Sequence, residues 1–300
     1  MNSYSCTLEK PHIEKLREDL SFMGFEFKDL NYGFFQALHK EKHLTISVFH
    51  SLKCLIQGKG TPDFIQFYLE PNLLKKISYG YEHLQYEEKV GMDESGKGDY
   101  FGPLVVASVF LPQQGFKPLQ QAGVMDSKKI SDSKIHELAK IIPLHASFKT
   151  LALSPEKYNE LYSSFKNLNV LLSWTHATCL KNLLSECKAS LALCDQFTKE
   201  PILDYYVKKM NLPVKLTQRT KAESDMAVAA ASIMARSVFL NRMKSLSEQY
   251  GIEFPKGAGP HTLKIVKKFL GKYPEEELKK IVKLHFKTTS EISTAEGHLL

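Results

Sequence analysis

Cysteine and tryptophan are scarce in this sequence of 300 residues, which contains five Cys and one Trp. The five cysteines are scattered, and none belongs to a Cys-x-x-Cys pair. An odd and unpatterned set of cysteines argues against a disulfide framework and against a zinc site, since both need regularly spaced cysteines. We therefore expect reduced thiols that serve mainly in packing.

Long apolar runs are also missing. A membrane-spanning helix needs about 18 consecutive apolar residues, and no run of that length occurs. The opening segment MNSYSCTLEKPHIEKLRED becomes charged too early for a secretory signal. With 43% hydrophobic and 24% charged residues, the composition excludes collagen-like, low-complexity and disordered classes. These features predict a soluble, cytoplasmic protein, and the length predicts about two domains.

The net charge of +7 is unevenly distributed. Residues 1–85 hold ten basic and ten acidic side chains, so the whole excess lies in the rest of the chain. Nine Lys and three Glu fall within residues 256–287. A basic region of this kind favours a polyanionic partner such as nucleic acid, although a Lys-rich solvated helix would give the same count.

The first part of the chain shows one helical segment followed by three strand-like segments. Apolar residues of the helical segment recur about every 3.6 positions, and the strand-like segments are separated by charged or glycine-containing turns. This pattern predicts a small α+β domain in which Tyr32, Phe34 and Phe35 are core residues, with exposed stacking residues as the alternative. The four segments are residues 11–23, 32–39, 43–50 and 52–58.

A polar, tyrosine-rich stretch separates this pattern from a second one. The β-branched segment PLVVASVFL is typical of a central strand, and further apolar strands alternate with helical segments, among them an Ala-rich helix at residues 221–243. Such alternation predicts an α/β domain. We place the first domain at residues 1–82, the linker at 83–88 and the second domain at 89–300.

Two adjacent carboxylates, Asp93 and Glu94, stand in the segment GMDESGKGDYFGPL. Neighbouring residues of a strand point to opposite faces, so both can serve one site only where the strand ends and the chain turns. Gly96 and Gly98 permit that turn. A turn-forming or solvated role for the pair is the alternative. A phosphate-binding P-loop is excluded, because Lys97 is followed by glycine instead of Ser or Thr.

Further acidic residues occur downstream. Asp195 ends the apolar segment SLALCD, where a carboxylate without a partner is unfavourable, although a turn residue would also fit. Glu223 and Asp225 open the Ala-rich helix, where residues two apart differ by about 200°. Both therefore cannot face one pocket, and one of them should cap the helix or face solvent. The small residues that follow let this helix approach a sheet closely.

Four carboxylates in one cluster repel each other unless cations neutralise them. Ligand sets made only of oxygen favour Mg²⁺ or Mn²⁺. Two such ions about 4 Å apart can activate a water and stabilise the leaving oxygen in phosphodiester cleavage. The basic C-terminal region would then hold the backbone of a nucleic acid.

Together these motifs resemble the type 2 ribonucleases H, and specifically the bacterial ribonucleases HIII. The resemblance rests on DESGKGDYFGPL, MDSKK, the strand ending in Asp195, and KAES followed by VAAASIMAR, and it covers about residues 88–285. It implies a ribonuclease H-like domain with a mixed sheet flanked by helices, preceded by a TATA-binding-protein-like domain that binds the substrate. The implied activity is metal-dependent endonucleolytic cleavage of the RNA strand of RNA/DNA hybrids, leaving 5′-phosphate and 3′-hydroxyl ends.

The resemblance also assigns residues. It implies that Asp93, Glu94 and Asp195 are metal-site carboxylates that hold two Mg²⁺ or Mn²⁺ ions. The fourth metal-site carboxylate is Glu223, because it follows Lys-Ala as in the family motif. The spacing from the third carboxylate, Asp195, favours Asp225 as the alternative. The residues expected to bind substrate are Ser95, Gly96, Lys97, Gly98, Lys128 and Lys129. Trp174 and His176 are expected to be core or groove-lining residues.

Other functions stay open at this stage. A different acidic two-metal nuclease, of the resolvase or integrase type, would use a similar carboxylate cluster. A non-catalytic hybrid-binding protein would use the first domain and the Lys-rich C-terminal region. The protein is expected to be a monomer with no membrane partner.

Overall fold

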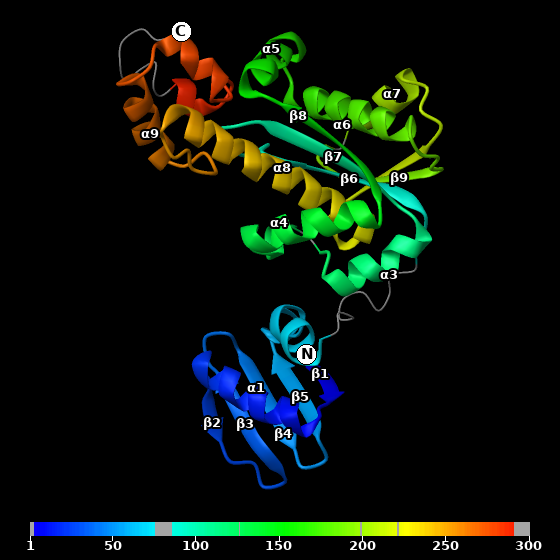
Figure 1. The fold of residues 1–300 in the computed structure, drawn as a ribbon, viewed down its shortest axis with the longest axis vertical. Helices are drawn as coiled ribbons and strands as arrows, with labels where there is room; N and C mark the ends of the chain where they lie inside the picture. The colour runs from blue at the N-terminus through cyan, green and yellow to red at the C-terminus, as the bar shows by residue number, and fades with distance from the viewer. Residues whose placement is uncertain (1–2, 76–85, 126, 199, 221, 291–300) are drawn as a thin grey trace. The chain divides into compact units, whose positions relative to one another are not determined.

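The chain divides into two compact units, Met1–Gln85 and Tyr86–Leu300, both drawn in Figure 1. Each unit is organised around a five-stranded sheet. No helix in the described part of the chain is long and apolar enough to cross a membrane. The linker predicted at 83–88 falls partly outside the described residues. The computed structural model describes residues 3–75, 86–125, 127–198, 200–220 and 222–290.

The first unit contains an antiparallel sheet with the strand order β1-β5-β4-β3-β2. The buried face of α1 carries Ile13, Leu16 and Leu20, which is the helical spacing predicted from the sequence. These side chains share one hydrophobic core with Ile46 and Ile56 of the sheet. The elements are β1 (Ser3–Thr7), α1 (Lys10–Phe22), β2 (Glu26–Lys28), β3 (Gly33–His39), β4 (Leu44–Phe49), β5 (Lys53–Gly58), α2 (Thr61–Phe64) and the π-helical segment η1 (Ile65–Leu74).

The aromatic residues around β3 are only partly in the core. Phe35 is 2% exposed, whereas Phe34 is 41% and Tyr32 is 83% exposed. Adjacent strand residues point to opposite faces, so Phe34 stands on the outer face, where its ring contacts His50. Tyr32 precedes the strand. The prediction of a core position was therefore wrong for Phe34, which the alternation of β3 places on the outer face, and for Tyr32, which lies outside the strand.

The second unit is built on a mixed sheet with the order β10-β9-β6-β7-β8. Strands β10, β9 and β6 are parallel, whereas β7 and β8 pair antiparallel. Helices pack on this sheet, which confirms the predicted α/β fold class. The elements are β6 (Lys89–Ser95), β7 (Leu104–Leu111), α3 (Gln113–Ala122), η2 (Ser127–Lys129), α4 (Asp132–Ile141), η3 (Ile142–Leu144), β8 (Ser147–Leu153), α5 (Pro155–Phe165), α6 (Leu168–Leu184), β9 (Leu191–Asp195), α7 (Ile202–Lys209), β10 (Lys215–Arg219), η4 (Ala222–Ser224), α8 (Met226–Tyr250), α9 (His261–Leu270) and η5 (Glu275–Lys280).

Helices α6 and α8 cover opposite faces of the mixed sheet (Figure 1). Met92 of β6 packs with Leu180 of α6 in one apolar cluster. On the other face, Leu193 of β9 packs with Val228 of α8. Because strand side chains alternate, the even-numbered residues of β6 and β9 face α6 and the odd-numbered residues face α8.

The long helix α8 lies directly against β6. A Cβ added at Gly91 would be 2.0 Å from the carbonyl carbon of Ala227 and 2.2 Å from the nitrogen of Val228. Only glycine fits at such a distance, and the small residues of α8 permit the approach as predicted. The helix predicted at 221–243 begins later, since η4 precedes it and the Asp225 carboxylate caps α8 by accepting from the Ala227 amide at 2.9 Å.

Candidate active site

Three of the predicted carboxylates meet at one end of the mixed sheet. Asp93 and Glu94 lie near the end of β6, and Asp195 ends β9. Met92 pairs with Cys194 in the parallel register, so Asp93 and Asp195 follow side by side on the face toward α8. Glu94 points toward α6. All three carboxylates line one pocket of about 380 Å³.

Two cationic or hydrogen-bonding groups hold the Glu94 carboxylate. The Nε2 atom of His176, a completely buried residue of α6, lies 3.1 Å from Oε2. Lys97 donates to Oε1 at 3.1 Å. Burial alone would raise the pKa of Glu94, but the contacts with His176 and Lys97 outweigh it and lower the pKa. Glu94 is therefore an oriented carboxylate anion.

Asp93 is in the opposite electrostatic situation. Burial and the neighbouring negative charge of Glu94 raise the pKa of Asp93, against weaker opposing contacts from the Glu94 amide, Ser232 and Lys128. The Glu94 amide donates to Asp93 Oδ1 at 2.8 Å. The Ser232 hydroxyl also lies 2.5 Å from the hydroxyl of Ser127. A further cation beside Asp93 would favour its ionised form.

The structure separates the two candidates for the fourth carboxylate. Asp225 caps α8 and forms an ion pair with Lys89 at 3.0 Å, both side chains being nearly buried. Lys89 begins β6, at the other end of the strand from Asp93. Glu223 lies next to Ala222, whose amide donates to Asp195 Oδ1 at 3.1 Å. No hydrogen bond or ion pair among the described residues engages the Glu223 carboxylate.

The turn that leaves β6 supplies most of the predicted substrate-binding residues. Gly96 has a φ of +89°, and a Cβ there would be 2.2 Å from the Pro103 carbonyl oxygen, so the turn requires glycine. The pocket with the three carboxylates is also lined by Ser95, Gly96, Lys97, Gly98 and Lys128. The side chain of Lys129, the last of the predicted residues, lies outside the described part of the chain.

Two residues were not assigned a site role from the sequence: Arg236, which lines the pocket, and His176, which contacts Glu94 from α6. Arg236 lines the pocket one turn of α8 beyond Ser232, and its Nη2 donates to Asp132 Oδ1 at 2.9 Å. The other oxygen of Asp132 accepts from Lys256 at 2.7 Å. The i, i+4 spacing of Ser232 and Arg236 could have indicated Arg236. No sequence pattern connects His176 with Glu94, because they meet only through the packing of α6 on the sheet.

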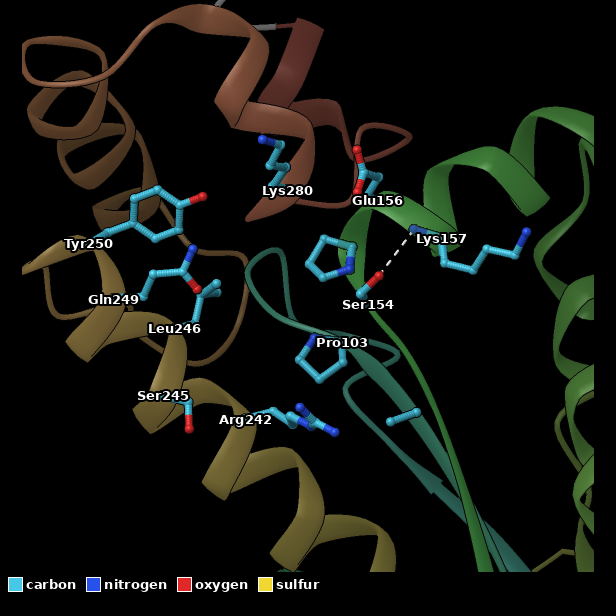
Figure 2. A pocket seen from close by; sticks show the side chains of 12 residues that line it. Pro103, Ser154, Glu156, Lys157, Arg242, Ser245, Leu246, Gln249, Tyr250 and Lys280 are labelled. Atoms are coloured by element: carbon cyan, nitrogen blue, oxygen red, sulfur yellow. Dashed lines mark hydrogen bonds between the residues drawn. The ribbon is translucent and has the colours of Figure 1, made fainter.

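A second pocket, of about 430 Å³, lies between α8, the start of α5 and η5 (Figure 2). Ser154 caps α5 there by accepting from the Lys157 amide at 3.2 Å. Among the described residues that line it, Glu156 alone is acidic. Lys280 and Lys157 pair with carboxylates, Glu277 and Glu160 respectively. This pocket lacks the carboxylate cluster that a metal-dependent nuclease needs.

The oxygen ligands of the carboxylate pocket suit divalent cations. In this structure, however, the carboxylate oxygens do not converge on one point. Asp93, Glu94 and Asp195 provide only oxygen ligands, the set that Mg²⁺ and Mn²⁺ prefer. Within the described ranges, no three or more His, Cys, Asp or Glu side chains are close enough together to hold an ion. Lys97 and His176 hold Glu94, and the Ala222 amide holds Asp195. Ion binding would therefore require these side chains to reorient.

Known proteins resemble this chain over nearly its whole length. A family model described as Ribonuclease HII matches residues 90–289. The chain is 42% identical to the ribonuclease HIII of Protochlamydia amoebophila over 96% of each chain, and 40% identical to that of Chlamydia trachomatis serovar D over 97% of each. Its fold matches the crystal structure of Bst-RNase HIII in complex with Mn²⁺, with a TM-score of 0.67, 26% identity and 99% of both chains covered. For Aquifex aeolicus RNase H3 the TM-score is 0.55, with 26% identity, 94% of this chain and 99% of that chain covered.

Proposed function

The chain belongs to the ribonuclease HII family and, within it, to the ribonucleases HIII, and from this premise we propose that the carboxylate pocket of the mixed sheet is its catalytic centre. The protein is a metal-dependent endoribonuclease that cleaves the RNA strand of RNA/DNA hybrids. The observation that supports the location is the parallel register of β6 and β9, which sets Asp93 beside Asp195 in one pocket with Glu94.

Asp93, Glu94 and Asp195, which line this pocket, are the groups that would hold Mg²⁺ or Mn²⁺. Glu223, which follows the residue whose amide contacts Asp195, would be the fourth. Two such ions, when bound, supply a water nucleophile at neutral pH and stabilise the leaving oxygen, which leaves 5′-phosphate and 3′-hydroxyl ends. Glu223 is preferred to Asp225 as the fourth ligand because its carboxylate has no partner among the described residues. The Asp225 carboxylate already accepts a hydrogen bond from the Ala227 amide and forms an ion pair with Lys89.

Choice of RNA over DNA requires recognition of the ribose 2′-hydroxyl group. Backbone amides of residues 95–98 are suited to this task, because Gly96 allows the tight turn and Gly98 carries no side chain that would keep a nucleic acid strand away. Gly98 is exposed at the pocket. Lys97 and Lys128 line the same pocket and would neutralise phosphates.

The first unit would serve as an accessory for hybrid binding, as in the TATA-binding-protein-like domain that the resemblance implies. Exposed Tyr32 and Phe34 support this role, since bases stack on aromatic side chains. We also propose a cytoplasmic monomer, which cell fractionation and light scattering would test. A dimer by light scattering would contradict the second part.

The activity is tested by matched substrates of one sequence: RNA/DNA, DNA/DNA and RNA/RNA duplexes with Mg²⁺ or Mn²⁺. Cleavage confined to the RNA strand of the hybrid is expected, and DNA cleavage would favour the resolvase-type alternative. An Asp195→Asn variant should bind the hybrid and lose at least about 100-fold in activity, since even partners of metal ligands contribute 10- to 100-fold. Unchanged cleavage would remove Asp195 from the site.

A further inference from the structure

Lys283 is a lysine whose side chain is completely buried, outside the carboxylate pocket. Its ammonium group donates to two backbone carbonyl oxygens, that of Asp99 at 2.8 Å and that of Gly102 at 2.7 Å. Both carbonyls belong to the segment that connects β6 to β7. Residues 95–98 of the same segment line the catalytic pocket.

Backbone contacts from the C-terminal region fix this segment as well. The Lys283 amide donates to the Tyr100 carbonyl at 2.9 Å, and the Gly102 amide donates to the Ile281 carbonyl at 2.9 Å. Between them, Phe101 and Val282 form an antiparallel bridge. The side chain and the backbone around Lys283 therefore bind the loop together from residue 99 to residue 102.

The same part of the loop is also attached to Gly257. The Asp99 carboxylate accepts from the Gly257 amide at 2.6 Å, and the Tyr100 amide donates to the Gly257 carbonyl at 3.0 Å. Gly96 and Gly102 both have positive φ values, +89° and +78°. The substrate-facing turn at residues 95–98 is therefore short, and its shape depends on the contacts that hold the residues following it, from Asp99 to Gly102.

Burying a lysine ammonium costs free energy unless polar partners replace the lost water. Apolar packing alone would not require a lysine at this position. The charged and titratable groups that face Lys283 are Asp99, Tyr158 and His285. Its ammonium lies 5.7 Å from the centre of the Tyr158 ring, and the Tyr158 hydroxyl lies 3.4 Å from His285 Nδ1. No carboxylate ion pair of Lys283 occurs among the described residues, so the two loop carbonyls are its principal partners.

We propose that Lys283 is a positioning residue that sets the geometry of the turn at residues 95–98, and so the preference for RNA/DNA hybrid over DNA duplex. The proposal rests on the proposed function of that turn. Removing the ammonium leaves two buried carbonyls without donors, which favours a rearranged loop. The catalytic carboxylates of β6 and β9 keep their strand positions, so substrate selection should suffer more than the chemical step.

The test compares Lys283→Met with Lys279→Met, an exposed lysine of η5. Binding is measured for an RNA/DNA hybrid and for a DNA duplex of the same sequence, with Ca²⁺ in place of Mg²⁺, and kcat and KM are measured separately with Mg²⁺. We expect Lys283→Met to lower the hybrid-over-DNA preference about three- to tenfold, the value of one hydrogen bond. KM for the hybrid should rise more than kcat falls, and Lys279→Met should match the unmodified protein.

A second variant covers the case in which Lys283→Met does not fold. Asn159, a partly exposed residue of α5, donates to the Lys279 and Val282 carbonyls at 3.0 and 2.9 Å and accepts from the Leu284 amide at 2.9 Å. Asn159→Ala loosens the segment that carries Lys283 without touching its ammonium. It should lower the hybrid preference in the same direction by a smaller factor.

The outcomes separate the inference from the proposed function. If the unmodified protein cleaves the hybrid and the folded variants keep its hybrid preference and its KM, the positioning role is wrong while the activity stands. If the unmodified protein shows no preference for the hybrid over DNA, the proposed function of the 95–98 turn fails first. Rescue of the preference by Lys283→Arg, which restores donors, would support the positioning role.

Discussion

The His176 imidazole lies 3.1 Å from the Glu94 carboxylate and is itself completely buried. Its ring stacks on Phe197, which lines the carboxylate pocket. α6 thereby controls the orientation of a proposed metal ligand on β6, from the face of the sheet opposite to α8. Partners of this kind commonly tune metal sites although they never touch the ion.

His176→Ala should lower activity about 10- to 100-fold, the range found for partners of metal ligands. The Mg²⁺ concentration at half-maximal activity should rise, because Glu94 loses the contact that orients it. A change that merely loosened the core would leave this concentration unaltered. His136→Ala, on α4 and away from the pocket, is the matched control. Unchanged Mg²⁺ dependence in folded His176→Ala protein would contradict the positioning role.

The two acids that open α8 should respond differently to replacement. Glu223→Gln should abolish most activity with little change in stability, because its carboxylate has no partner among the described residues. Asp225→Asn keeps an oxygen for the Ala227 amide but loses the ion pair with Lys89. It should lower the free energy of unfolding by about 1.5–3 kcal/mol, the range for charged hydrogen bonds, while the folded protein still cleaves. Urea unfolding measures the stability of each variant, and cleavage assays measure its activity. Loss of activity in Asp225→Asn with full activity in Glu223→Gln would make Asp225 the fourth ligand.

Arg236 is expected to contact a substrate phosphate. Arg236→Gln should weaken hybrid binding and reduce the slope of log affinity against log salt by about one, as expected for one lost phosphate contact. Arg242 lies on the same helix but lines the second pocket (Figure 2). Arg242→Gln should leave the slope unchanged. A salt slope that does not change in Arg236→Gln would show that its guanidinium serves only to hold Asp132.

Local sequence patterns predict the strand ends that carry Asp93, Glu94 and Asp195, but not the side chains that contact these carboxylates. The apolar strand ending in Asp195 and the glycines after Glu94 predict strand ends and a turn, and these depend on neighbouring residues alone. Glu94 meets His176 and Lys283 meets the Asp99 carbonyl over 82 and 184 positions of the chain. Contacts of this separation depend on helix packing, which a single sequence does not encode as a pattern.

Strand alternation explains both a success and an error. It correctly indicates that Asp93 and Glu94 point to opposite faces, and their common pocket forms because β6 ends there and Gly96 turns the chain. The same rule, had it been applied to β3, would have placed Phe34 outside the core. The capping role of one acid at the start of α8 was expected, and the hydrogen bond from the Ala227 amide identifies Asp225 as that acid.

Lys283 should make stability depend on pH. Burial lowers its pKa to about 7 from an ordinary value of 10.5, despite the opposing charge of Asp99. The folded state therefore holds fewer protons than the unfolded state between about pH 7 and pH 10.5, so stability should rise with pH through that window. One such proton changes the unfolding free energy by at most about 1.4 kcal/mol per pH unit. Below about pH 7 both states are protonated, and the contribution of Lys283 becomes constant.

Urea unfolding at pH 6 and pH 9 tests this, with Lys283→Met as the reference that lacks the titrating group. The neutral amine retains hydrogens for the carbonyls of Asp99 and Gly102, so the contacts survive deprotonation. The unmodified protein should gain stability relative to Lys283→Met on going from pH 6 to pH 9. A difference between the two proteins that stays constant over this range would mean that Lys283 keeps an ordinary pKa, and that the buried ammonium is better solvated than its surroundings indicate.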